Sequence, residues 1–121
     1  MAAINLDIST KLDITCRRND SFSLELTMTD PDGDAIDLTE YSSFLMEVRR
    51  HDRKTGTATL AMRSESNEIT GTSGGILSIT KAAASMNISG GTYVYDLQAT
   101  KNSVVTTWLR GKFIINEDVT I

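Results

Sequence analysis

Apolar residues recur at every second position over most of this chain. Between residues 4 and 16 the even positions read Ile, Leu, Ile, Thr, Leu, Ile and Cys, whereas every odd position is polar. Successive side chains of a β-strand point to opposite faces, so this alternation predicts strands with one buried face and one wet face. It also excludes a doubly wound parallel sheet, whose strands are apolar on both faces.

Seven segments carry the strand signal, with turn signals about every 8–12 residues between them. The first is long enough that we expect a break near Ser9–Thr10, and residues 36–39 are expected to form an extended link. One run, residues 81–86, favours a short helical turn. The predicted fold is an all-β, antiparallel, immunoglobulin-like β-sandwich, with a small barrel as the alternative. The apolar positions delimit the strands at 4–16, 22–28, 44–48, 58–62, 77–79, 93–99 and 104–115.

The 121 residues leave room for one domain. Residues 11–121 are interpreted as a single sandwich, and residues 1–10 as an N-terminal arm or first strand. No apolar run long enough for a signal peptide or a membrane span is found, so we expect a soluble chain made in a cytoplasm. The net charge of −4 argues against nucleic-acid and membrane partners, which require a basic surface.

Few residues are suited to catalysis. The single histidine, His51, lies in the basic run Arg49–Lys54, which is interpreted as a solvated loop and as the one basic patch of the chain. The single cysteine, Cys16, lies in the inward register of its strand and is expected to be a buried, unreactive thiol. No phosphate-binding loop or zinc spacing is present. We therefore expect neither an enzyme nor a cofactor.

One acidic loop is a candidate for metal binding. Asp30, Asp32 and Asp34 match the first three ligand positions of a calcium loop of the EF-hand type. The loop then lacks glycine at position 6, where Ala35 stands, and glutamate at position 12, where Tyr41 stands. A polar hairpin turn is the competing interpretation, and no metal is assigned.

The last two strands suggest an interface, because their polar face becomes apolar. If Leu109 and Phe113 are buried, then Val94, Val104, Trp108 and Ile114 form an apolar contact face. The alternative is a bulge at Gly111 that shifts the register and buries Trp108 in the core. A second interface is predicted in the arm, where Ile4, Leu6 and Ile8 could add a strand to a neighbouring subunit.

Four motifs give the chain a resemblance to a known group of proteins: Arg18-Asn19-Asp20-Ser21-Phe22, Asp32 to Thr39, Gly91 to Leu97, and Gly111 to Thr120. They resemble the immunoglobulin-like N-terminal module of baseplate upper proteins and of related tail or head-fibre proteins in tailed bacteriophages. The likeness spans about Lys11 to Thr120, and its residues occupy turns and strand edges, which specify a fold better than a role.

The resemblance implies a non-enzymatic structural protein of the virion, assembled in the cytoplasm of a host bacterium and often oligomeric. Such modules commonly continue into a receptor-binding or stalk region, whereas this sequence stops at Ile121; this favours an adaptor, collar or decoration subunit whose partners are other virion proteins. The alternative function is a carbohydrate- or receptor-binding sandwich in which Trp108, Tyr41 and loop carboxylates meet the ligand. A small hydrolase is the third hypothesis, disfavoured by the lack of a recognisable nucleophile and base.

Overall fold

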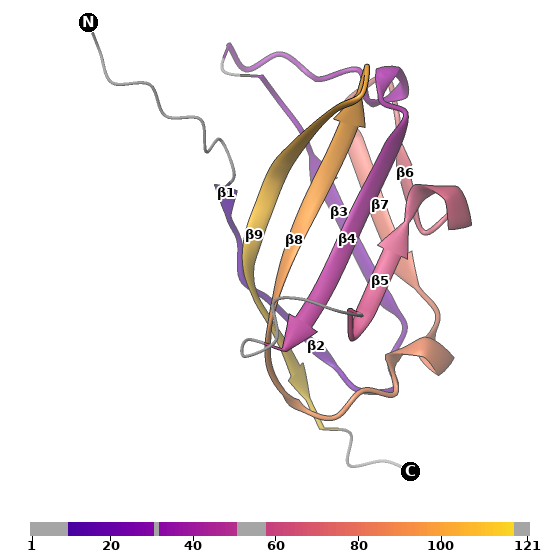
Figure 1. Ribbon diagram of the computed structural model, residues 1–121, viewed down its shortest axis with the longest axis vertical. Helices are drawn as coiled ribbons and strands as arrows, with labels where there is room; N and C mark the ends of the chain where they lie inside the picture. The colour runs from indigo at the N-terminus through magenta and orange to yellow at the C-terminus, as the bar shows by residue number, and fades with distance from the viewer. Residues whose placement is uncertain (1–9, 31, 51–57, 118–121) are drawn as a thin grey trace, which may run out of the picture.

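Two β-sheets pack face to face in the computed structural model, which describes residues 10–30, 32–50 and 58–117 (Figure 1). The larger sheet has the strand order β1-β9-β8-β4-β5, and β2 also pairs with β9. Its strands are β1 (Thr10–Lys11), β2 (Ile14–Arg17), β4 (Ser43–Arg50), β5 (Leu60–Arg63), β8 (Gly91–Lys101) and β9 (Val104–Asn116). The smaller sheet has the order β3-β7-β6, from β3 (Phe22–Thr27), β7 (Ile76–Lys81) and β6 (Ile69–Gly71).

This strand order is that of an immunoglobulin-like sandwich. β4, β8 and β9 correspond to strands C, F and G of that fold, and β3, β7 and β6 to strands B, E and D. Tyr93 lies near the start of β8, and its hydroxyl donates a hydrogen bond of 2.7 Å to the carbonyl of Ser89. This contact is the tyrosine corner typical of the fold. The prediction of an all-β, immunoglobulin-like sandwich is confirmed.

The alternating apolar residues form the core between the sheets. Met46, Val48 and Leu97 from the larger sheet and Leu77 and Ile79 from the smaller sheet are fully buried. The rings of Phe22 and Phe113 meet across the core with their centroids 5.5 Å apart. Burying each such side chain contributes about 1.5–3 kcal/mol, so the core follows directly from the period of two.

Pairing at one edge of the larger sheet differs from the predicted antiparallel arrangement. β1 and β2 both run parallel to β9, with Thr10 opposite Leu109 and Ile14 opposite Phe113. The described pairing of this edge is interrupted at Leu12–Asp13, between β1 and β2, whereas the break predicted near Ser9–Thr10 falls at the limit of the described residues and stays a prediction. Gly111 makes this edge possible, since a Cβ atom there would lie 2.3 Å from the carbonyl oxygen of Leu12.

Three short 3₁₀ helices complete the described chain. η3 (Ala83–Met86) confirms the helical turn predicted at residues 81–86. η1 (Leu38–Glu40) replaces part of the predicted extended link, because the Asp37 side chain accepts a hydrogen bond from the Thr39 amide and closes a turn. η2 (Ser64–Ser66) and β6 were not predicted, since β6 has three residues and only Ile69 among them is buried, too few to display a period.

Candidate interaction site at the edge of strand β9

One stretch of β9 presents an open edge within the described part of the chain. On one side β9 pairs with β8 from Val104 to Ile115, but on the other its pairing with β1 begins only at Leu109. The segment Val104–Trp108 therefore has no described strand on its outer side. Val104 is 63% exposed and Val105 58% exposed, and they are the large hydrophobic residues exposed among those described. We call this segment the open edge of β9. Unpaired edges of this kind are templates for pairing with another chain.

A β-bulge places Trp108 beside this edge. Leu97 pairs with Leu109 and Gln98 with Thr107, so Trp108 is an extra residue opposite β8. Because of the bulge, Trp108 and Leu109 are both buried, at 9% and 7% exposure. The assignment of Trp108 to an exposed contact face is wrong. The alternative, a core residue buried by a bulge, is the one observed, although the bulge lies at Trp108 and not at Gly111.

The predicted apolar face does not form as one surface. Val94 and Ile114 are half-buried near one end of the β8–β9 pair, whereas Val104 lies at the opposite end of β9. Between them the outer face carries Arg110 opposite Asp96 and, on the next strand, Glu47 opposite Asp96. The prediction failed because alternation identifies the face of a strand but not the bulge that reverses it. Ile4, Leu6 and Ile8, the predicted arm, lie outside the described residues.

A groove opens between the sheets next to the open edge of β9. It has a volume of about 460 Å³, and its lining is mainly apolar. The Tyr41 and Trp108 rings meet edge to face with their centroids 4.9 Å apart. The Lys101 ammonium lies over the Tyr41 ring, 5.5 Å from the ring centroid. The residues lining the groove are Thr10, Met28, Thr29, Asp30, Ile36, Tyr41 and Trp108. The lining thus includes Trp108, Tyr41 and the loop residue Asp30, which are of the kinds named for the carbohydrate-binding alternative.

The acidic loop forms a hydrogen-bonded turn. The Asp30 carboxylate accepts hydrogen bonds from the amides of Asp32 and Asp34, both at 3.0 Å. In the described part of the chain no group of three or more His, Cys, Asp or Glu side chains is placed to hold a metal ion. The weak calcium candidates Asp30, Asp32 and Asp34 are therefore not assembled into a site, because one carboxylate is directed at the backbone of its own turn.

Two half-buried carboxylates lie opposite each other on the outer face of the larger sheet. Asp96 of β8 pairs with Glu47 of β4. Burial, and secondly the charge of Glu47, raise the pKa of Asp96, against the opposing effect of Arg49. Glu47 is also 3.3 Å from Arg49 in an ion pair. This polar pair occupies the middle of the face on which the sequence predicted an apolar contact surface.

The remaining candidates for chemistry are not brought into one site. Cys16 is half-buried, and burial followed by the charge of Asp20 raises the pKa of its thiol, which agrees with the expectation of an unreactive group. His51, Arg53 and Lys54 lie outside the described residues, so a pairing of Cys16 with His51 stays untested. Arg49 and Arg50 belong to the end of β4.

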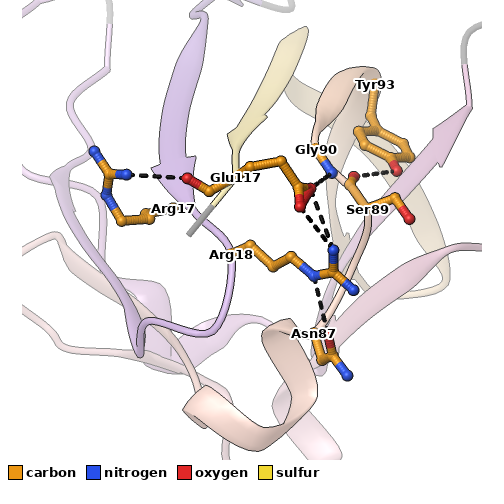
Figure 2. Close-up of polar contacts among 7 residues, drawn as sticks. All are labelled: Arg17, Arg18, Asn87, Ser89, Gly90, Tyr93 and Glu117. Atoms are coloured by element: carbon orange, nitrogen blue, oxygen red, sulfur yellow. Dashed lines mark hydrogen bonds and ion pairs between the residues drawn. The ribbon is translucent and has the colours of Figure 1, made fainter. Parts of the chain in front are cut away.

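Two residues of the motifs that carry the resemblance, Arg18 and Glu117, meet in a polar cluster just after the ends of β2 and β9 (Figure 2). The Arg18 guanidinium contacts the Glu117 carboxylate at 2.8 Å and the Asn87 side-chain oxygen at 2.9 Å. The Gly90 amide donates to the same carboxylate, and Arg17 donates to the Glu117 carbonyl at 3.1 Å. The hydrogen bond from Gly90 and that from Arg18 lower the pKa of Glu117. We call this group the Arg18–Glu117 cluster. Sequence reasoning missed it, because its members are separated by as many as 100 positions.

No helix in the described ranges is long and apolar enough to cross a membrane.

Comparisons with known proteins identify no family for this chain. No protein-family model and no curated protein sequence matches the chain. An endo-β-1,4-mannanase from Thermotoga petrophila matches at 10% identity and a TM-score of 0.49, over 87% of this chain. The chain spans 18% of that enzyme.

Two further solved structures are similar along almost their whole length. The extracellular domain of the voltage-gated sodium channel β4 subunit, described as a parallel homodimer with a role in cell–cell adhesion, is 8% identical over 97% of this chain and all of its own, with a TM-score of 0.38. A sodium channel β subunit described for its multimeric cell-adhesive interactions is 10% identical over 96% of this chain and 98% of its own, also at 0.38. Because the TM-scores of all three structures are below 0.5, the immunoglobulin-like assignment of this chain rests on its strand order and on the Tyr93 corner.

Proposed function

We propose that this chain is a non-enzymatic assembly module of a tailed-phage particle, acting by contact with other virion proteins and with further copies of itself. The observation that supports assembly is the open edge of β9, with two exposed valines on a segment that has no strand on its outer side among the described residues. A strand added to such an edge gains main-chain hydrogen bonds and side-chain contacts together. The phage setting comes from the resemblance of the turn motifs, two of which meet in the Arg18–Glu117 cluster. The corresponding location is the virion, reached after synthesis in the bacterial cytoplasm.

Light scattering on the purified chain tests the assembly role. We expect the mass to rise above 13.2 kDa with concentration, and Val105→Lys to reduce that rise, because a lysine on a strand edge disfavours edge pairing. Thr70→Lys is the matched control, since it adds the same charge to an exposed position of the smaller sheet. A strict monomer at high concentration that also fails to associate with phage particles would overturn the proposal.

A carbohydrate- or receptor-binding module is the second candidate. It is favoured by the groove, which gathers Tyr41, Trp108 and Asp30. Two features weigh against a sugar: the Trp108 ring is mostly buried, and Tyr41 lies edge-on to it, so no broad aromatic face is offered for stacking. Titration with neutral and acidic oligosaccharides, followed by Trp108 fluorescence, tests this candidate. A saturable change would favour it over assembly.

A further inference from the structure

Four charged residues form one row across the outer face of the larger sheet. Glu47 of β4 stands opposite Asp96 of β8. Asp96 in turn stands opposite Arg110 of β9, and Arg110 stands opposite Lys11 of β1. Each of the four is flanked on its own strand by a residue that is buried or packed against the core, so the row faces outward. We call it the charged row, and it reads acid, acid, base, base across four neighbouring strands.

A hollow lies at each half of the charged row. The hollow at the acidic half has a volume of about 190 Å³, and its lining includes Glu47 and Asp96. The hollow at the basic half has a volume of about 290 Å³, and its lining includes Lys11 and Arg110. Val94 belongs to both linings, so the two hollows adjoin. The outer face therefore has room at both halves for long charged side chains of a partner.

The two halves of this face have opposite charge. Glu47 and Asp96 line the acidic hollow together with one cation, Arg49, which forms an ion pair with Glu47 at 3.3 Å. Burial and the charge of Glu47 raise the pKa of Asp96 in spite of Arg49, so ionised Asp96 still carries an electrostatic cost. The basic hollow has a third cation, Lys112, in its lining and no acidic residue. Cations brought over the acidic half would offset the cost at Asp96.

We propose that a second copy of this chain packs on this face, with the two charged rows opposed across a two-fold axis that runs parallel to the strands between β8 and β9. Such an axis reverses the order of the strands, so Glu47 of one copy faces Lys11 of the other, and Asp96 faces Arg110. A two-fold axis across the strands would instead set each residue of the row opposite its own equivalent, like charge against like. Of the two orientations that align the strands, the charges favour one.

The order of the charges is the reason for choosing a second copy as the partner. A face of a single sign would require a partner of the opposite sign. A row of two acids followed by two bases is complementary to itself once it is reversed, and a two-fold axis supplies that reversal. The inference rests on the proposed assembly function and adds a surface separate from the open edge of β9.

Exchange of charge between the two ends of the row tests this packing. Lys11→Glu places a carboxylate opposite Glu47 of the second copy, and Glu47→Lys places a cation opposite Lys11. We expect each variant to weaken the dimer at least about fivefold, because the altered contact occurs twice in a two-fold dimer. The chain that carries both substitutions has opposite charges across the interface again. Its dissociation constant should return to within about threefold of the wild-type value.

The rescue is informative because Lys11 and Glu47 are far apart in one copy. They lie three strand spacings from each other, roughly 14 Å, so their charges meet only between two copies. Sedimentation over a concentration series measures the dissociation constants, and thermal unfolding verifies that each variant is folded. Glu25→Lys is the matched control, since it makes the same change of charge at an exposed position of β3 and should alter the dimer less than about twofold. Lys11→Glu, at an exposed position, tests the face by itself if Glu47→Lys does not fold.

The outcomes separate this inference from the proposed function. Single variants that associate as tightly as the wild-type chain, or a double variant that stays weak, would refute the opposed rows. If association is unchanged in Lys11→Glu and is lost in Val105→Lys, copies assemble through the open edge of β9, and the proposed function stands without this face. A wild-type chain that remains a strict monomer at high concentration would refute both the dimer and the association of copies.

Discussion

Tyr41 and Trp108 meet edge to face at 4.9 Å between ring centroids, and Phe44 packs on the same indole at 5.8 Å. Trp108 thereby closes one end of the core, although it lies next to an open strand edge. This position makes it both a core residue and one wall of the groove.

Replacing Trp108 by serine should destabilise the fold strongly. Removing a large buried aromatic side chain costs about 3–5 kcal/mol, because contacts are lost and a cavity remains. Urea unfolding followed by circular dichroism measures the change, since the variant lacks its fluorophore. Val104→Ser, at a position 63% exposed, is the control and should stay within about 0.5 kcal/mol. A loss below about 1 kcal/mol at Trp108 would contradict the core assignment.

Gly111→Ala should weaken the attachment of β1 and β2 to β9. The added Cβ would lie 2.3 Å from the Leu12 carbonyl oxygen, so the backbone has to move, at a cost of about 1–3 kcal/mol. Gly74→Ala is the matched control, because its nearest atom is 3.8 Å away. Amide exchange of Ile14–Arg17 should rise in the first variant and not in the second. Unchanged exchange in both variants would contradict the close approach.

Asp96→Asn should stabilise the protein at neutral pH. Burial and the facing Glu47 raise the pKa of Asp96, so the folded state binds a proton more tightly than the unfolded state does. The cost of ionised Asp96 therefore disappears as the pH falls through that raised pKa. Like charges on facing strands cost about 0.2–1 kcal/mol, which is the expected gain. The free energies of unfolding of the wild-type protein and of Asp96→Asn, measured across this pH range, should therefore become equal at acid pH. A gain that persists there would show that charge is not the cause.

Glu68→Gln should destabilise the protein at neutral pH and lose its effect in acid. Desolvation raises the pKa of Glu68, but hydrogen bonds from Lys81 and the Arg63 amide outweigh it and hold the pKa below the usual value. The stabilisation is therefore present above the unfolded-state pKa and is lost as the pH falls through the folded-state pKa. We expect a loss of about 1–2 kcal/mol in urea unfolding at neutral pH. Glu65→Gln, in a more exposed pair with Arg63, is the control and should change little.

Tyr93→Phe tests the tyrosine corner. The variant removes the hydroxyl that donates to the Ser89 carbonyl and keeps the ring in the core, so we expect a loss of about 0.5–1.5 kcal/mol. Thermal unfolding measures it. An unchanged unfolding temperature would mean that water hydrogen-bonds to the Ser89 carbonyl as well as the Tyr93 hydroxyl does.

Much of the fold could be read from residue spacing, because alternation is a local property of strands. Odd positions of residues 93–99 predicted Tyr93, Tyr95 and Leu97 as buried, and they are. The candidate site was predicted in part. Tyr41 and Trp108 were named for one alternative function, and the structure places both in one groove. The predicted face of Val94, Val104 and Ile114 failed, since those residues lie at opposite ends of a sheet with a charged middle.

The sequence by itself determined that this chain forms half-buried strands, with short polar turns and an apolar face for each. That information is local, because the direction of a side chain along a strand depends only on its neighbours. The tertiary structure alone decided the bulge that buries Trp108, the parallel pairing of β1 and β2 with β9, and the contact of Arg18 with Glu117. Those features depend on which distant strands lie side by side, and the free energy that selects the pairing comes from contacts across the whole core.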